Sequence, residues 1–159
     1  MGTQVEPSVK AACLLSSLRR ASRAVTQLYD LVLAPVKLKA TQLFILTEIN
    51  RSGELAQHEF AERYGVAVET LSRRFCVLRR KGLLVCRSGP RKEQIYSLTP
   101  HGKETLAQAM RYWELAEFRL RTSLGESDWE RLHVLALRSA AAAKEAERLR
   151  TANQMRRAA

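Results

Sequence analysis

Apolar residues recur at helical spacing over long stretches at both ends of the chain, and this pattern constrains the fold more than any other feature. Near the N-terminus, six of them follow at alternating intervals of four and three residues, which indicates one apolar face of a helix over residues 8–34. Ser8 is expected to cap this helix and Pro35 to end it. The six are Leu14, Leu18, Ala21, Val25, Leu28 and Val32.

Two more long helices are predicted after residue 99. Thr99 and Pro100 form a helix start, and that helix is expected to reach about residue 122. The last helix is predicted from about Ser127 to Leu149, capped by Ser127 or Asp128, and the final TANQMRRAA is expected to fray. Both carry apolar stripes that one compact core would leave exposed to water, so the flanking helices are predicted to associate with a second copy of the chain.

The middle of the chain predicts short, compact elements. Helices are expected over 41–51, 57–64 and 68–81, and two β-branched or aromatic segments, 83–87 and 94–98, are expected to pair as a hairpin. The fold class is therefore mainly α with a small β-hairpin.

Charge is concentrated rather than spread evenly. The 159 residues carry a net charge of +11, and residues 67–93 hold eight basic and two acidic side chains, a net +6. A basic chain of this size usually binds a polyanion, most often nucleic acid. Charged residues interrupt every apolar stretch before a membrane span is reached, and the first ten residues do not form a signal peptide.

The cysteines and histidines give no metal site. Cys13, Cys76 and Cys86 are odd in number and widely spaced, which argues against a disulfide framework and a zinc site and favours a reducing cytoplasm. The scattered histidines have no ligand spacing, and no nucleophile–base pair or phosphate loop occurs. The sequence therefore predicts no cofactor and no enzyme activity.

Residues 57–82 predict a helix-turn-helix. Gly65 supplies the turn, and a helical wheel at 100° per residue places Leu71, Phe75 and Leu78 on one buried face. Opposite and flanking positions carry the side chains expected to read bases in a major groove. These are Thr70, Ser72, Arg73 and Arg74. The side chains expected to engage phosphates or the minor groove are Arg80, Arg87, Arg91 and Lys92.

Specific segments resemble the MarR family of transcriptional regulators. They are Ala21–Tyr29 (ASRAVTQLY), Leu38–Leu43 (LKATQL), Leu71–Leu84 and Ser97–Gly102 (SLTPHG). The resemblance runs from about residue 12 to about residue 150 and implies a winged helix-turn-helix domain at 37–99. Residues 1–36 and 100–159 would form the helical dimerisation region. It also implies a homodimeric repressor on a pseudo-palindromic double-stranded operator, cytoplasmic and nucleoid-associated in a bacterium or archaeon.

Two positions depart from the family pattern. An Asp and an Arg that brace the family's wing loop fall at Pro90 and Lys92, so Arg91 or Lys92 is expected to serve at the wing tip. The Ser or Thr that caps the third helix is replaced by Ala56, which is expected to cost about 1 kcal/mol of cap stability.

The resemblance also implies a possible effector. Many members release DNA on binding a phenolic or aromatic carboxylate between the dimer helices and the winged domain, where Arg23, Tyr29, Phe44 and Trp113 are the candidates here. For each residue alone, an ordinary core or hinge role is the simpler interpretation.

Three alternatives stay open. Thiol oxidation would act at Cys13 or Cys76, although the reactive cysteine of the family's peroxide sensors falls at Leu15 and one partner tyrosine at Ala40. A winged-helix protein-interaction module would not need the basic face. A thiol enzyme built on Cys13 would lose turnover in Cys13→Ser.

Overall fold

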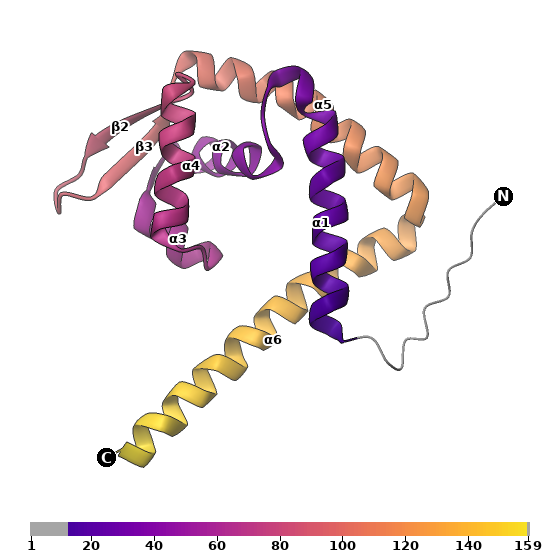
Figure 1. The fold of residues 1–159 in the computed structure, drawn as a ribbon, viewed down its shortest axis with the longest axis vertical. Helices are drawn as coiled ribbons and strands as arrows, with labels where there is room; N and C mark the ends of the chain where they lie inside the picture. The colour runs from indigo at the N-terminus through magenta and orange to yellow at the C-terminus, as the bar shows by residue number, and fades with distance from the viewer. Residues whose placement is uncertain (1–12, 159) are drawn as a thin grey trace. The chain divides into compact units, whose positions relative to one another are not determined.

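The structure is a computed structural model that describes residues 13–158, and it is mainly helical with a small antiparallel sheet, as the sequence predicts (Figure 1). In chain order the elements are α1 (Leu14–Val32), a 3₁₀ turn η1 (Ala34–Val36), α2 (Ala40–Ser52), β1 (Glu54–Ala56), α3 (Gln57–Tyr64), α4 (Val68–Arg80), β2 (Leu84–Ser88), β3 (Gln94–Leu98), α5 (Pro100–Leu124) and α6 (Glu126–Ala158).

The first and last helices differ from the prediction at their ends. Residues 8–12, including the expected cap Ser8, lie outside the described part of the chain. The last helix begins close to the predicted start, at Glu126, but Ser127 and Asp128 lie inside it rather than capping it, and it continues to Ala158, beyond the predicted end at Leu149. Residues 150–158 contain no glycine or proline and consist largely of good helix formers, so nothing in them ends the helix.

The sheet contains one strand that the sequence pattern did not indicate. β1 pairs with β3, and β3 pairs with β2, so the order is β1-β3-β2 with both pairs antiparallel. Tyr96 at the centre of β3 lies opposite Leu55 on one side and Cys86 on the other. Because β1 has only three residues, it is too short to show a period of two.

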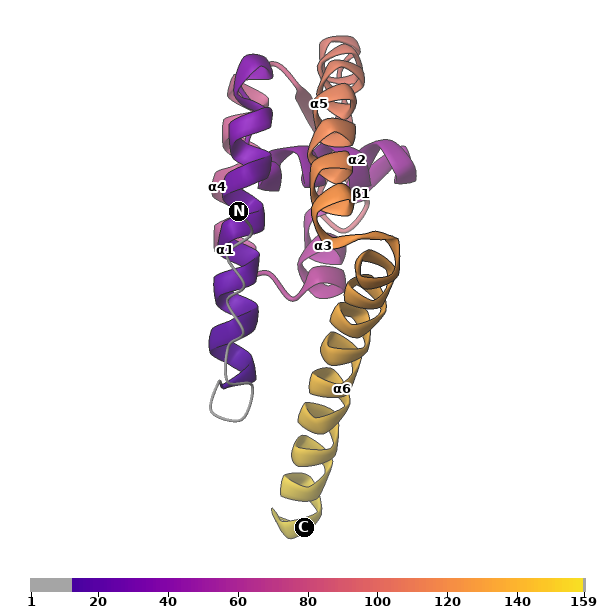
Figure 2. The same cartoon turned by 90° about the vertical axis from the view of Figure 1, so that its right-hand side faces the viewer.

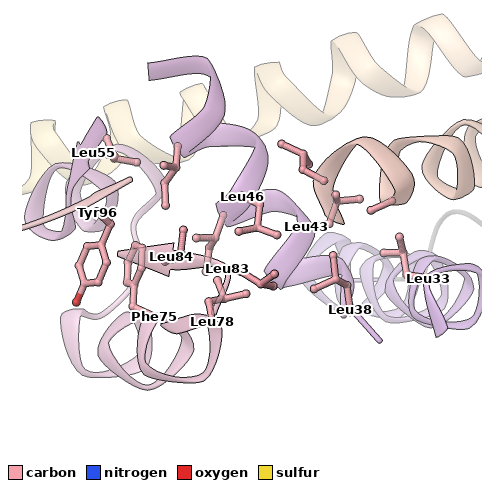
Figure 3. Packing of buried hydrophobic residues seen from close by; sticks show 14 of the residues in the cluster. Leu33, Leu38, Leu43, Leu46, Leu55, Phe75, Leu78, Leu83, Leu84 and Tyr96 are labelled. Carbon is pink, nitrogen blue, oxygen red and sulfur yellow. The ribbon is translucent and has the colours of Figure 1, made fainter. Parts of the chain in front are cut away.

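The core lies where α2 and α4 meet the sheet. Leu46, Leu78 and Phe75 are completely buried, and Figure 3 shows Leu46, Leu78 and Leu83 gathered from α2, α4 and the segment before β2. α2 runs crosswise to α1 in both views (Figures 1 and 2). Asp30 of α1 fixes this junction, because its Oδ1 accepts a hydrogen bond from the Ala40 backbone N–H at 2.7 Å.

The start of α5 is locked against the end of α4. Thr99 caps α5 as predicted: its hydroxyl accepts the Gly102 N–H at 2.8 Å and donates to the Gly82 carbonyl at 2.6 Å. A Cβ on Gly102 would lie 3.0 Å from the Leu83 carbonyl carbon and closer still to its oxygen. Only glycine therefore allows α5 to start this close to the backbone before β2.

Contacts divide the chain into two compact units, Met1–Ala116 and Glu117–Ala159, with the boundary inside α5. Within the second unit, the Arg121 guanidinium pairs with the Glu126 carboxylate, and the rings of Trp129 and His133 meet edge-on with centroids 4.5 Å apart. No helix within residues 13–158 is long and apolar enough to cross a membrane.

Candidate DNA interface and ligand pocket

The helix predicted to read DNA shows the expected two faces. Leu71, Phe75 and Leu78 of α4 are fully buried, and the predicted base-reading residues Thr70, Ser72 and Arg73 are exposed. Arg74 is half-buried at the edge of that surface. Gly65 adopts the left-handed conformation (φ 61°) that the turn before α4 requires.

A buried amide connects α3 to α4. Gln57, at the first position of α3, is 8% exposed and is the buried polar side chain of the described core. Its Nε2 donates to Ser72 Oγ at 2.6 Å and to the Val68 carbonyl at 3.2 Å. Ala56 provides no side-chain cap for α3, as the sequence predicts.

This contact defines what the Ser72 hydroxyl can do. Its oxygen accepts from Gln57, so its hydrogen remains available to donate outward. Ser72 is thus oriented as a donor, which suits a phosphate oxygen or an acceptor on a base edge.

Tyr96 extends the same network to the wing. Its ring stacks on Phe75 with centroids 4.1 Å apart, and its hydroxyl donates to Gln94 Oε1 at 2.6 Å and lies 3.4 Å from Gln57 Oε1. Burial, together with the neighbouring Cys86 thiol, raises the pKa of Tyr96 to about 12. The phenol therefore remains a protonated donor at neutral pH.

The wing loop is braced by a residue that the family comparison did not indicate. Glu93 Oε2 accepts the Arg91 backbone N–H at 2.7 Å, while the Gly89 N–H donates to the Glu93 carbonyl at 2.8 Å. Lys92 adopts a left-handed conformation (φ 62°) and donates its N–H to the Gly89 carbonyl at 3.0 Å. The loop holds its shape without the missing Asp–Arg pair, and Arg91 and Lys92 are exposed.

Arg87 forms an ion pair with another residue of the same chain, at the surface of the sheet. Its Nε donates to Glu54 Oε1 at 3.1 Å and its Nη2 pairs with the other carboxylate oxygen, so β2 is tied to β1 across β3. The hydrogen bond from Arg87 lowers the pKa of Glu54. Because both side chains are about half exposed (54% and 48%), a DNA phosphate could compete for this guanidinium. Arg80, at the end of α4, is exposed.

Three of the four candidate ligand residues line one cavity. It has a volume of about 410 Å³ and lies between α1, α2 and α5. Tyr29, Phe44 and Trp113 contribute to its wall, whereas Arg23 lies elsewhere, in an open depression on α1. Among the described residues, those lining the cavity are uncharged, and its hydroxyl groups belong to Thr26, Tyr29 and Thr47.

The thiols are dispersed. Cys13 directly precedes α1 and is exposed, Cys76 is exposed on α4, and Cys86 is half-buried; none of the three forms a disulfide. Among residues 13–158, no group of His, Cys, Asp and Glu side chains could hold a metal ion.

Solved structures with this fold identify the family. The MosR transcriptional regulator of M. tuberculosis is 32% identical, with a TM-score of 0.76 over 85% of this chain and 98% of MosR. The chain belongs to the MarR family.

Other MarR-family structures agree with this assignment. MosR in complex with DNA is 31% identical, with a TM-score of 0.76 over 84% of this chain and 98% of MosR. CouR, a transcriptional repressor bound to p-coumaroyl-CoA, is 27% identical, with a TM-score of 0.75 over 80% of this chain and 91% of CouR. The matched proteins are transcriptional regulators rather than enzymes. No family model and no curated protein sequence matches the chain.

Sequence reasoning missed Gln57, Glu54 and Glu93, which organise this MarR-type surface. Each acts through a contact with a residue that is distant in sequence or through the loop backbone. Only Glu93 carried a local signal, an acid directly after the basic wing tip.

We predict that Gln57→Leu lowers the free energy of unfolding by about 1–3 kcal/mol, since the hydrogen bonds to Ser72 and Val68 are lost. Urea unfolding measures this change. His58→Leu, on the next and exposed residue, is the matched control and should stay within about 0.5 kcal/mol of wild type. Equal midpoints for the two variants would show that the network does not stabilise the fold.

Proposed function

We propose that the protein is a homodimeric, sequence-specific DNA-binding repressor that a small aromatic or phenolic ligand releases from its operator. The observation that carries the proposal is the two-faced α4, whose apolar side is buried in the core while Thr70, Ser72 and Arg73 are exposed on a basic segment. MosR, at 31% identity, has been crystallised with DNA, which supports DNA rather than a protein partner as the target.

The proposed contacts divide into two kinds. Arg73 and Arg74 would read guanine edges in the major groove, with Thr70 and Ser72 contacting bases or nearby phosphates. The wing residues Arg91 and Lys92, together with Arg80 and Arg87, would engage the phosphates or the minor groove and fix the register. Arg87 would exchange its Glu54 partner for a phosphate.

We predict that Arg73→Ala weakens binding to the cognate operator by about 1–3 kcal/mol and relaxes specificity at one base pair. Lys92→Ala should instead weaken all sequences alike and reduce the salt dependence. Fluorescence anisotropy on operator and scrambled duplexes separates the two effects, with Lys103→Gln, on exposed α5 surface, as the charge control. An unchanged operator affinity in Arg73→Ala would contradict the assigned reading helix.

We also propose that two copies assemble through the long helices. Several large apolar side chains are exposed in one copy of the chain, including Leu14, Leu15 and Leu31 on α1 and Leu135 and Leu137 on α6, all more than half exposed. A second copy would cover them, and two-fold symmetry would then require a pseudo-palindromic operator with half-sites about one helical turn apart.

The expected mass in light scattering is twice the 18.0 kDa of one chain. Leu135→Glu places a charge in the proposed interface and should shift the mass toward one chain while abolishing tight operator binding. Leu149→Glu, near the end of α6, tests how far the interface extends. A wild-type mass of one chain would refute the dimer.

The cavity between α1, α2 and α5 is the proposed effector site. Its aromatic and hydroxyl-bearing wall suits a phenolic ring, and CouR, at 27% identity, holds p-coumaroyl-CoA. Since such a regulator acts on the chromosome, we propose a cytoplasmic, nucleoid-associated location in a bacterium or archaeon.

We predict that salicylate quenches the fluorescence of Trp113 in a saturable manner and displaces operator DNA over the same concentration range. The chain has two tryptophans, so Trp129→Phe should retain the quench and Trp113→Phe should lose it. A quench that survives Trp113→Phe with full amplitude would show that the phenol binds elsewhere.

A further inference from the structure

A second hollow lies on a different face of α5 from the proposed effector cavity. It has a volume of about 370 Å³, and its wall includes Lys37, Lys81 and His101. At 100° per residue, His101 and Gln108 lie roughly opposite Met110 and Trp113, which line the first cavity. The two hollows therefore use separate faces of one helix.

Three distant parts of the chain build this basic groove. Lys37 follows the 3₁₀ turn in a left-handed conformation (φ 53°), Lys81 is the C-cap residue of α4, and His101 is the second residue of α5. The Lys81 ammonium donates to the Lys37 carbonyl at 2.5 Å and lies 3.4 Å from Gln42 Oε1. This long-range hydrogen bond holds the Lys81 ammonium against the backbone of Lys37.

The wall of the groove combines basic, apolar and neutral polar side chains. Val36, Leu38 and Leu83 are its apolar lining residues, and Thr105 and Gln108 add neutral polar groups. Among the described residues that line the groove, none is acidic. A neighbouring hollow of about 580 Å³ shares Pro35, Val36 and Gln108 with it and adds Arg111, so the positive character continues along α5.

Lys39, close to Lys37 in the sequence, pairs with the Asp30 carboxylate at 3.3 Å. Within residues 13–158, no ion pair involves Lys37 or Lys81, so neither lysine of the groove wall has a carboxylate partner there. A wall that combines basic and apolar side chains complements a ligand that has an anionic head and an apolar body.

We propose that this groove is a second ligand site, distinct from the effector cavity, which binds a small organic anion: a carboxylate or phosphate monoester carried on an apolar body. The anionic head would lie between Lys37, Lys81 and His101, and the apolar body would lie on Val36, Leu38 and Leu83. This site goes beyond the proposed function, because neither DNA reading nor the aromatic effector requires it.

The test uses the full-length protein without DNA and three probes of similar size: benzoate, phenyl phosphate and the neutral benzyl alcohol. Backbone amide chemical shifts report the site of binding. Benzoate or phenyl phosphate should shift the signals of His101, Thr105 and Gln108, and comparison of the two probes shows which head group is preferred. Benzyl alcohol should leave these signals unchanged.

The variant for this test is Lys37→Gln combined with His101→Gln, which keeps the Lys81 anchor intact. Because two charge-assisted contacts are lost, the Kd of the preferred anion should rise at least about tenfold. Lys103→Gln removes one positive charge from the same helix outside the groove and should leave the Kd unchanged.

Three results would overturn the proposal. The first is equal binding of the anions by wild type and the double variant. The second is a set of shifts confined to Trp113 and its surroundings, which would assign the anions to the effector cavity. The third is loss of operator affinity in the double variant while neither anion shifts the groove signals, which would make the groove a contact for DNA phosphate.

Discussion

A single buried amide joins α3, α4 and the central strand of the sheet. Gln57 lies at the first position of α3, yet its hydrogen bonds reach two residues of α4, and the Tyr96 hydroxyl lies within 3.4 Å of its oxygen. The stack of Phe75 on Tyr96 adds an apolar contact to the same junction. Since buried polar groups are costly when unpaired, this network favours one relative position of α3, α4 and the wing strand.

The regular elements could be predicted from the sequence because their signals are local. The spacing of Leu71, Phe75 and Leu78 identified the buried face of α4, and Thr99 with Pro100 marked the start of α5. The family resemblance led to Tyr29, Phe44 and Trp113, which the structure brings to one cavity.

What could not be predicted depends on contacts between distant residues. β1 has a partner only because the chain returns through β3, and the Glu54–Arg87 pair exists only across that sheet. Arg23 shares a sequence segment with Tyr29 but lies on a different part of the α1 surface. The end of α6 was placed too early because Leu149 closes the apolar stripe, although the backbone continues as helix through residues that favour it.

The wing loop is held by its backbone and by one carboxylate. Its shape depends on the Glu93 carboxylate and on backbone groups of Gly89, Arg91 and Lys92 rather than on the side chains at the tip. Here the hydrogen bonds that shape the loop do not involve the side chains of Arg91 and Lys92, so replacing either side chain leaves the hairpin's bonding in place.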